Sequence, residues 1–374
     1  MTAGATPTLR VAVNVRNLTG PHTGIEVYMQ ALLGALADTG QLDITALSWS
    51  PVGLELPRVR EVVPVRRPDL APGSARATLW KLWFDHWGCV RGLPPESVLY
   101  HGMDGFLPLG IRRRDRCVAT VHDLGWQVHP ELYGRRLRVM YGAQFPWVVR
   151  RANRFVAVSR YTADDLMRRA GVPSSRIDVV YHGLDPAFDA AQTATPPAEG
   201  PYLLAVGGVS PRKNTRRLLD AFARWRERGG DARRHRLLIT GLSLDRDFLQ
   251  DAAPPEGVSL LGYVDKAELP RLYANAAAFV YPGIYEGFGL PIVEAMACGA
   301  PVVTSTTGAA PEVAGGAAVL VDPFDVGSIE AGLERATRPE EAARLRALGR
   351  ERARAFRWQD AAAATIDTYR RAAA

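Results

Sequence analysis

Short apolar runs, each followed by a longer stretch of helical pattern, recur from one end of the chain to the other. Because successive residues in these runs are apolar, both faces of each strand must be buried, as in a parallel sheet covered by helices. The runs lie at residues 10–15, 44–49, 98–101, 117–122, 154–159 and 177–182 in the first half, and at 202–206, 237–240, 259–261, 278–281, 301–305 and 318–321 in the second. This alternation predicts a doubly wound α/β fold with about six strands in each half.

The chain of 374 residues is too long for one ordinary domain, and its composition offers one clear break. Residues 187–201 read AFDAAQTATPPAEGP, without periodicity and rich in Pro, Gly and small polar residues, which is typical of a linker. We therefore expect one Rossmann-like domain at 1–190, a linker at 191–200 and a second Rossmann-like domain at 201–355. Residues 356–374 are helical in pattern; packing of this helix back onto the first domain is one arrangement that the pattern allows.

The formal net charge of +7 and the pI near 9.5 are modest for this length. A basic balance is compatible with phosphorylated ligands, anionic membrane surfaces or nucleic acid. The sequence carries neither paired Cys/His zinc spacing nor an aromatic RNP-type motif, so we expect no nucleic acid partner. It leaves the oligomeric state open.

The three cysteines, Cys89, Cys117 and Cys298, are far apart and mostly embedded in apolar sequence. This pattern predicts buried free thiols in a reducing compartment. Residues 1–9 lack the charged and apolar regions of a signal peptide, and no apolar run approaches the ~20 residues of a membrane helix. We expect a cytoplasmic protein.

The most informative segment, YPGIYEGFGLPIVE, follows the predicted strand at 278–281 directly. Gly287 and Gly289 free the backbone for a close approach to a ligand, and Pro291 suits the first turn of a helix expected to end at Ala297. A loop and a helix N-terminus at the carboxyl end of a parallel strand form a ready anion site, and two such domains would face each other across a cleft.

Two acids flank this loop. We expect Glu294 in the first helical turn, where a carboxylate that only accepts hydrogen bonds suits the diol of a ribose. Glu286 could accept hydrogen bonds from sugar hydroxyls. The alternative is an ordinary strand-to-helix turn with acids favoured by the helix dipole.

A second glycine turn, VGGVSPRKN, follows the first strand of the second half. Gly208 lies in the turn, and Arg212 and Lys213 could neutralise a diphosphate, including the charge that develops on a departing one. A solvated helix start is the alternative.

Two segments of the first half join these candidates. His122 and Asp123 end a strand, where the imidazole could hydrogen-bond a transferred sugar and the carboxylate could orient it or contact an acceptor. Gly24 belongs to GPHTGIEVY, which resembles a phosphate-facing loop but is not GxGxxG, so it argues against a dehydrogenase. A structural histidine and a plain turn are the alternatives.

Other patterns are weaker. Tyr263 and Val264 follow a second-half strand and could cradle a base, or simply end that strand. Asp245 and Asp247 match an Asp-x-Asp metal motif superficially, but acids are expected at a helix start, so we expect no metal and no cofactor.

A stripe of Trp80, Trp83, Phe84 and Trp87 at helical spacing indicates either core or an interfacial helix near a lipid-linked acceptor.

With these segments in order, the chain resembles the retaining glycosyltransferases of family four, which have the GT-B fold, and among them the mannosyltransferase B group. The resemblance rests on EGFGLPIVE, PRKN, GYVDKAELPRLYANA, EAMACGAPVV and PEVAGGAA in the second half, and on VHDLGWQVHPELYG and VAVSRYTADDL in the first. It implies an acceptor-binding first domain, a nucleotide-sugar-binding second domain and retention of anomeric configuration. Many members carry an Arg where this chain has Val209, and Arg212 is expected to substitute for it.

The resemblance implies that Arg212 and Lys213 bind the donor diphosphate, Glu294 the ribose, and Glu286 and the amides near Phe288 the sugar. The catalytic candidates are His122, Asp123 and Glu286, and the donor-binding candidates are Gly24, Gly208, Arg212, Lys213, Tyr263, Val264, Gly287, Phe288, Gly289, Leu290 and Glu294.

The expected reaction moves a hexose, preferably mannose from GDP-mannose, to a hydroxyl of a glycan, lipid-linked glycan or small-molecule acceptor. UDP- and dTDP-sugars are alternative donors, and peripheral membrane contact is compatible with a lipid-linked acceptor. A sugar-nucleotide epimerase, which needs no acceptor, and a non-enzymatic basic binding module remain the rival classes.

Overall fold

The computed structural model describes residues 8–19, 24–71, 73–96, 98–189, 200–241 and 254–374. Contacts divide the chain into two compact units: unit 1 comprises residues 1–124, 134–183 and 358–374, and unit 2 comprises residues 125–133 and 184–357. Three parts of the sequence analysis lie outside the described residues: positions 20–23 of the first glycine loop, the pair Asp245 and Asp247, and nearly all of the expected linker.

Unit 1 contains a parallel sheet of seven strands in the order β3-β2-β1-β4-β5-β6-β7. The strands are β1 (Leu9–Asn14), β2 (Leu42–Leu47), β3 (Val59–Val62), β4 (Leu99–Gly102), β5 (Arg116–Val121), β6 (Arg154–Ala157) and β7 (Ile177–Val179). All six runs predicted in this half form strands, and a seventh strand joins them. The missed strand, β3, lies at the sheet edge, where Arg60 and Glu61 interrupt the apolar pattern because that strand is not buried on both faces.

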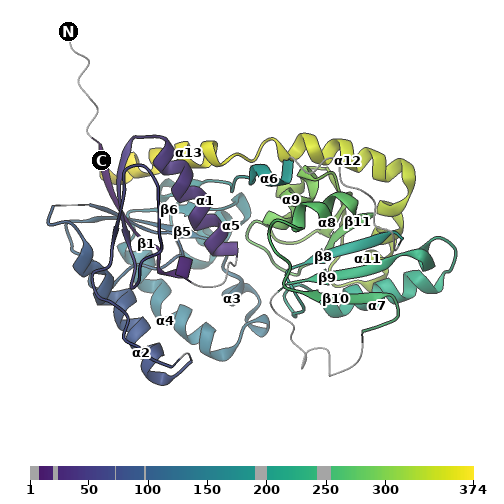
Figure 1. The fold of residues 1–374 in the computed structure, drawn as a ribbon, viewed down its shortest axis with the longest axis horizontal. Coiled ribbons are helices and arrows are strands. Elements are labelled where there is room, and N and C mark those ends of the chain that lie inside the picture. Colours follow the sequence, from purple (N-terminus) through teal and green to yellow (C-terminus); the bar gives the residue numbers. More distant parts are fainter. Residues whose placement is uncertain (1–7, 20–23, 72, 97, 190–199, 242–253) are drawn as a thin grey trace, which may run out of the picture. The chain divides into compact units, whose positions relative to one another are not determined.

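Helices cover both faces of this sheet (Figure 1). They are α1 (Gly24–Asp38), α2 (Ala75–Trp83), α4 (Arg135–Arg151), α5 (Arg160–Ala170) and α13 (Trp358–Ala373), with short helices η1 (Arg16–Thr19), η2 (Phe84–Gly88), η3 (Cys89–Gly92) and η5 (Ser174–Arg176). One core cluster joins α1 and α13 to the sheet, and a second joins residues of α4, α5 and η2 to it.

The helix α13 is an integral part of unit 1. Its residues Trp358, Ile366 and Tyr369 are buried in the core cluster that α1 forms with the sheet. The Tyr369 hydroxyl lies 2.7 Å from Nδ1 of His101, whose Nε2 lies 2.8 Å from the Thr120 hydroxyl. Polar groups buried in this way need such partners, so the helix is fixed in register as well as held by apolar contacts.

Unit 2 contains a parallel sheet of six strands in the order β10-β9-β8-β11-β12-β13. The strands are β8 (Tyr202–Val206), β9 (Arg236–Thr240), β10 (Val258–Gly262), β11 (Ala278–Tyr281), β12 (Val302–Ser305) and β13 (Ala318–Val321), which confirms the six predicted runs. Both sheets follow the order 3-2-1-4-5-6 of a doubly wound Rossmann sheet, so the predicted fold class is confirmed.

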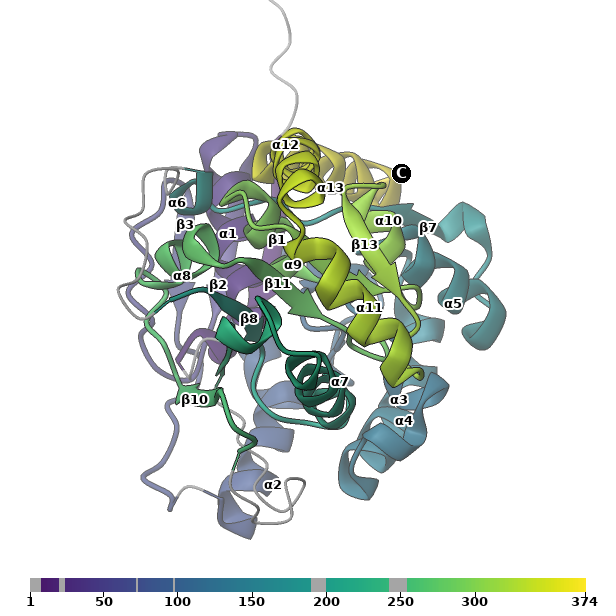
Figure 2. The ribbon, with the colours of Figure 1, turned by 90° about the vertical axis from the view of Figure 1, so that its right-hand side faces the viewer.

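The helices of unit 2 are α3 (Gly125–Val128), α6 (Pro186–Asp189), α7 (Thr215–Glu227), α8 (Leu269–Asn275), α9 (Leu290–Ala297), α10 (Ala310–Ala314), α11 (Val326–Thr337) and α12 (Pro339–Ala353), with η4 (Pro130–Leu132) and η6 (Ala232–Arg234). Figure 2 shows α7 and α11, which pack against one another. Phe188 on α6 packs against Tyr273, and its carbonyl accepts from Sγ of Cys298 at 3.2 Å. The chain therefore enters unit 2 after Gly183, ahead of the expected boundary at 190.

Cys89, Cys117 and Cys298 are buried free thiols, as the sequence predicts. The tryptophan stripe divides: Phe84 is fully buried and Trp80 and Trp83 pack against the core, whereas Trp87 is 46% exposed. The core interpretation therefore holds for most of the stripe.

Candidate functional site

The loops that follow β8 and β11 meet at one point of the unit 2 sheet. These two strands are neighbours, although the chain visits β9 and β10 between them, so the strand order reverses there. Ligands of doubly wound sheets bind beside the carboxyl ends of the strands at such a switch point. The two most informative sequence segments, 206–214 and 281–294, are thereby brought together.

An ion cluster joins the two loops. Nη1 of Arg212 and Nζ of Lys213 each donate to one oxygen of Glu286 at 2.9 Å. The same Nζ donates to the hydroxyl of Tyr281 and lies 4.5 Å from the centre of that ring. Each carboxylate oxygen of Glu286 thus accepts a hydrogen bond from one cation.

The electrostatics of Glu286 follow from this arrangement. Burial, with only 9% of the residue exposed, would raise the pKa of its carboxyl, but Arg212 and Lys213 outweigh burial and hold that pKa below its usual range. The carboxylate therefore stays ionised and fixes both cations in place. The cluster thus holds two cationic side chains in fixed positions, which suits the binding of an anion.

The glycine turn after β8 forms the surface against which the Lys213 side chain packs. Gly207 and Gly208 have φ values of 113° and 77°, and both of their amides donate to the carbonyl of Thr240 on β9. A Cβ at Gly207 would lie 2.8 Å from Cε of Lys213, so the lysine stem runs directly over the bare backbone. Because Gly207 has no side chain, the stem of Lys213 can lie directly against the backbone of the turn.

Three residues that the sequence did not single out hold the loop after β11. The Ser305 hydroxyl donates to the Gly283 carbonyl at 2.5 Å, and the Thr307 hydroxyl donates to the Ile284 carbonyl at 2.8 Å. Gly308, with φ 66°, lies so close that a Cβ there would meet the carbonyl oxygen of Glu286 at 2.8 Å. These contacts come from the last residue of β12 and the segment that follows it, so they depend on β12 lying beside β11 in the folded sheet.

Asn214 links the two loops as well. It is buried, adopts a left-handed φ of 60° and precedes α7. Its Nδ2 donates to the carbonyl of Pro282 at 3.0 Å and to the carbonyl of Pro323 at 2.5 Å. The side chain thus fastens the Arg212 and Lys213 turn to the loop of Glu286.

The helix α9 begins at Leu290 because Gly289, with φ 97°, takes the left-handed N-cap conformation, and Pro291 lies in its first turn. Glu294 is the fifth helical residue, so the expectation of Glu294 in the first turn was wrong. Its Oε2 accepts from the Tyr273 hydroxyl at 3.0 Å. Burial nevertheless raises the pKa of Glu294 to about 7.

The other donor candidates differ in exposure. Gly287, Phe288 and Gly289 are buried, and the Phe288 ring packs edge-on against Phe356 with the ring centres 5.6 Å apart. Leu290 is half-buried. Tyr263 and Val264, beyond β10, are 56% exposed and half-buried, respectively.

A segment inserted between β5 and α4 covers part of the β11 loop. Residues 125–133 leave unit 1 and pack in unit 2. The rings of His129 and Tyr285 lie 5.9 Å apart, and a Cβ at Gly125 would meet the Tyr285 ring at 3.0 Å. The segment therefore packs against the loop that carries Glu286.

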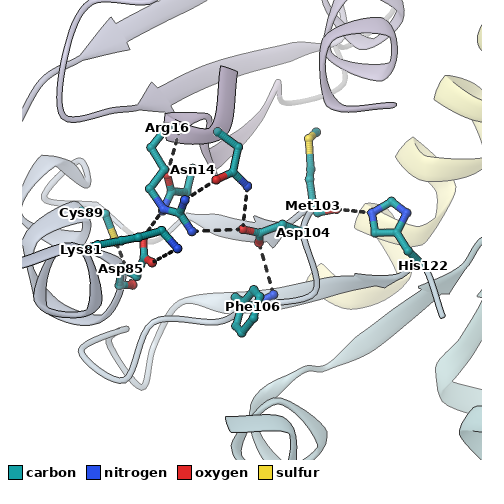
Figure 3. Close-up of polar contacts among 10 residues, drawn as sticks. Asn14, Arg16, Lys81, Asp85, Cys89, Met103, Asp104, Phe106 and His122 are labelled. Atoms are coloured by element: carbon teal, nitrogen blue, oxygen red, sulfur yellow. Dashed lines mark hydrogen bonds and ion pairs between the residues drawn. The ribbon is translucent and has the colours of Figure 1, made fainter. Parts of the chain in front are cut away.

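The switch point of unit 1 lies between β1 and β4 and holds a second charged cluster, around the buried Arg16 (Figure 3). The guanidinium of Arg16 is hydrogen-bonded to Asp85 and lies 3.6 Å from Asp104. Nζ of Lys81 lies 3.8 Å from the second oxygen of Asp85. Asn17 donates to Asp104 at 3.3 Å.

His122 lies beside this cluster, at the end of β5 (Figure 3). Its Nε2 lies 2.8 Å from the Met103 carbonyl, an atom that can only accept, so Nε2 carries a proton. Burial lowers the pKa of His122, so the neutral ring keeps a lone pair on Nδ1. Asp123 is half-buried, and Gly24 is exposed at the start of α1.

Two family profiles match the chain. One, described as "Glycosyltransferase Family 4", matches residues 22–188, and one described as "Glycosyl transferases group 1" matches residues 200–338. The O-antigen chain mannosyltransferase B of Escherichia coli is 33% identical over 291 residues, which cover 74% of each chain.

Solved structures share the fold. A sucrose-phosphate synthase from Thermosynechococcus elongatus aligns with a TM-score of 0.73 at 21% identity, covering 97% of this chain and 98% of that one. HepE of Anabaena, in complex with UDP and glucose, aligns with a TM-score of 0.67 at 17% identity, covering 97% and 98%. Among the described helices, none is long and apolar enough to cross a membrane.

Proposed function

The chain belongs to glycosyltransferase family 4, has the GT-B fold, and we propose that it transfers mannose from GDP-mannose to a hydroxyl of a glycan, lipid-linked glycan or small-molecule acceptor. The choice of mannose follows the name of the Escherichia coli relative, which is a mannosyltransferase. The HepE structure holds UDP, so UDP-sugars, together with dTDP-sugars, are the alternative donors.

The observation that carries the proposal is the pair of cations held over Glu286 at the switch point of unit 2. A nucleotide-sugar offers a diphosphate, and that diphosphate gains negative charge as its bond to the sugar breaks. Cations that are already fixed in place stabilise this charge more than they stabilise the bound substrate. We assign Arg212 and Lys213 to the diphosphate and Glu294 to the ribose.

The proposed reaction retains configuration and uses no metal. The acceptor hydroxyl attacks the anomeric carbon on the face that the diphosphate leaves. The bond from that carbon to the phosphate oxygen breaks, the bond to the acceptor oxygen forms, and the hydroxyl proton passes to the departing phosphate. We assign His122, through the lone pair on Nδ1, to a hydroxyl of the transferred sugar.

The test begins with binding. Thermal unfolding of the whole chain is followed with GDP-, UDP- and dTDP-sugars, because a ligand of the folded state raises the midpoint. GDP-mannose should give the largest shift, and Lys213→Ala should abolish it. Arg224→Ala, at an exposed position of α7, is the control and should leave the shift unchanged. If no nucleotide-sugar shifts the midpoint, the donor assignment is wrong.

Transfer is then measured with a fluorescent oligomannoside as acceptor, and NMR of the product reports its anomeric configuration. Activity in excess chelator is expected to equal activity without it. Consumption of the nucleotide-sugar at the same rate without any acceptor would favour the epimerase alternative instead.

A further inference from the structure

Two helices of unit 1 bury almost none of their residues. The helix α2 has no buried residue, and among the 17 residues of α4 only Val148 is buried. Most helices of globular domains hide an apolar stripe. Each of these two packs one side against the core of the unit, through Trp80 and Trp83 of α2 and Val148 of α4, and leaves the rest of its surface open.

Large apolar side chains remain exposed on these helices and on η2, which continues α2. The exposed fractions are 66% for Leu79, 37% for Leu82, 46% for Trp87, 37% for Leu137 and 64% for Val139. Arg76, Leu79 and Leu82 follow one another at intervals of three, so they share one face of α2. Four such residues on α2 and α4, with Trp87 on η2, are more than the scattered apolar exposure of an ordinary surface.

The same helices are strongly cationic. The helix α2 carries two cationic residues and α4 carries five, and neither contains an acidic residue. Their combined charge of +7 equals the formal net charge of the whole chain, so the remaining residues balance to zero. These 26 residues thus carry a net charge of +7 without an acid, whereas the rest of the chain carries as many acidic as basic residues.

The two helices adjoin one another. Nη2 of Arg136 on α4 donates to the hydroxyl of Thr78 on α2 at 3.3 Å, and Figure 1 shows the helices together in unit 1. Arg136 and Val139 are three residues apart and share one side of α4, next to Thr78 of α2. We name the exposed side chains at this junction the α2–α4 face: Arg76, Leu79 and Leu82 of α2 and Arg135, Arg136 and Val139 of α4.

We propose that the α2–α4 face docks on the surface of an anionic lipid bilayer. Apolar side chains enter the boundary between headgroups and acyl chains, while arginine and lysine heads remain among the phosphates. The helices α2 and α4 carry no acid that would repel an anionic surface, and the one acid of the adjoining η2, Asp85, is paired with Arg16 and Lys81. This assignment does not rest on the proposed glycosyl transfer.

The first test uses the apolar residues. The full chain is sedimented with phosphatidylcholine vesicles that contain phosphatidylglycerol, and with vesicles of phosphatidylcholine alone. The native protein should bind the anionic vesicles at least about tenfold more strongly. The double variant Leu79→Asp, Val139→Asp should lose most of this binding, whereas Leu320→Asp, Leu348→Asp, at exposed positions of unit 2, should keep it.

The second test uses charge. Arg76→Glu, Arg135→Glu should weaken binding by about tenfold or more, since each basic residue near the surface contributes on the order of 1 kcal/mol, or about fivefold. The control Arg224→Glu, Arg357→Glu makes the same change in net charge at exposed positions of unit 2 or its edge and should weaken binding by no more than about twofold.

Each variant is accepted only if its thermal midpoint matches that of the native protein. Equal binding to both kinds of vesicle, or equal loss in the control variants, would overturn the proposal. A dimer in solution that Leu79→Asp, Val139→Asp dissociates, without selective binding to anionic vesicles, would instead assign the face to a second copy of the chain.

Discussion

Ionisation of Glu294 should control donor affinity between about pH 6 and pH 8, because burial raises the pKa of this carboxyl to about 7. If Glu294 holds the ribose as proposed, the ionised form is the one that binds. A carboxylate accepts hydrogen bonds from both hydroxyls of a diol, whereas the protonated acid has one oxygen occupied by its own proton.

The magnitude follows from that pKa. With a value of about 7, roughly a tenth of Glu294 is ionised at pH 6 and roughly nine-tenths at pH 8. Because binding selects the ionised fraction, the association constant of GDP-mannose should rise by about tenfold across this range, equivalent to ~1.4 kcal/mol.

The assay is isothermal titration calorimetry of GDP-mannose at several pH values, in two buffers of different ionisation enthalpy, which counts the protons released on binding. Release should approach one proton at low pH and fall toward zero at high pH. The variant Glu294→Gln keeps the shape of the side chain but does not titrate, so its weaker affinity should be flat with pH. An affinity that is equal at both ends of the range, or a rise that persists in the variant, would refute this role for Glu294.

The same pKa predicts a stability effect without donor. The folded protein holds the Glu294 proton to higher pH than the unfolded chain does, so this carboxyl makes stability fall as the pH rises from about 4.5 to about 7. Because the residue is only half-buried, the effect should be on the order of 1–3 kcal/mol. Thermal unfolding of Glu294→Gln should lack this part of the slope.

Three further substitutions probe the contacts that shape each unit. Glu286→Gln removes the carboxylate between Arg212 and Lys213 and should lower stability by ~1–3 kcal/mol, a midpoint shift of roughly 2–12 °C in a domain of this size; the loss should shrink in acid below the usual range of a glutamate, because the native carboxyl, whose pKa is lowered, is then protonated too. Tyr369→Phe strands Nδ1 of His101 in the core of unit 1 and should cost ~1–3 kcal/mol in urea unfolding, without changing donor affinity. Gly308→Ala should destabilise the chain more than the control Gly316→Ala, because both glycines have positive φ but only Gly308 lies against the backbone of Glu286; equal losses would contradict the importance of that contact.

The sequence predicts the fold well where burial is two-sided. All twelve expected strands form, because runs such as residues 202–206 and 278–281 are apolar on both faces and can only lie inside a covered sheet. The edge strand β3 escapes the same reasoning, since Arg60 and Glu61 face a less buried environment. A run of apolar residues in the sequence indicates a strand that is buried on both faces, and the edge strand β3 has no fully buried residue.

For the candidate site, the sequence predicts individual residues but not the contacts between them. The sequence brings out Arg212, Lys213 and Glu286, because glycines and charges concentrate after two strands. It does not disclose that these three side chains bind one another, nor that Gly308 supports their loop, since both depend on which strands become neighbours. The expected place of Glu294 was wrong because helix α9 already begins at Leu290, directly after the left-handed Gly289, so that Glu294 is its fifth residue.

The membership of α13 in unit 1 has a consequence for how the protein comes into being. This helix follows the whole of unit 2 in the chain, yet it supplies Trp358 and Tyr369 to the core of unit 1. During synthesis, therefore, the apolar side chains of α1 that α13 covers in the folded protein stay uncovered until the rest of unit 2 has been made. Unit 1 can complete its core only once residues 358–374 have been synthesised.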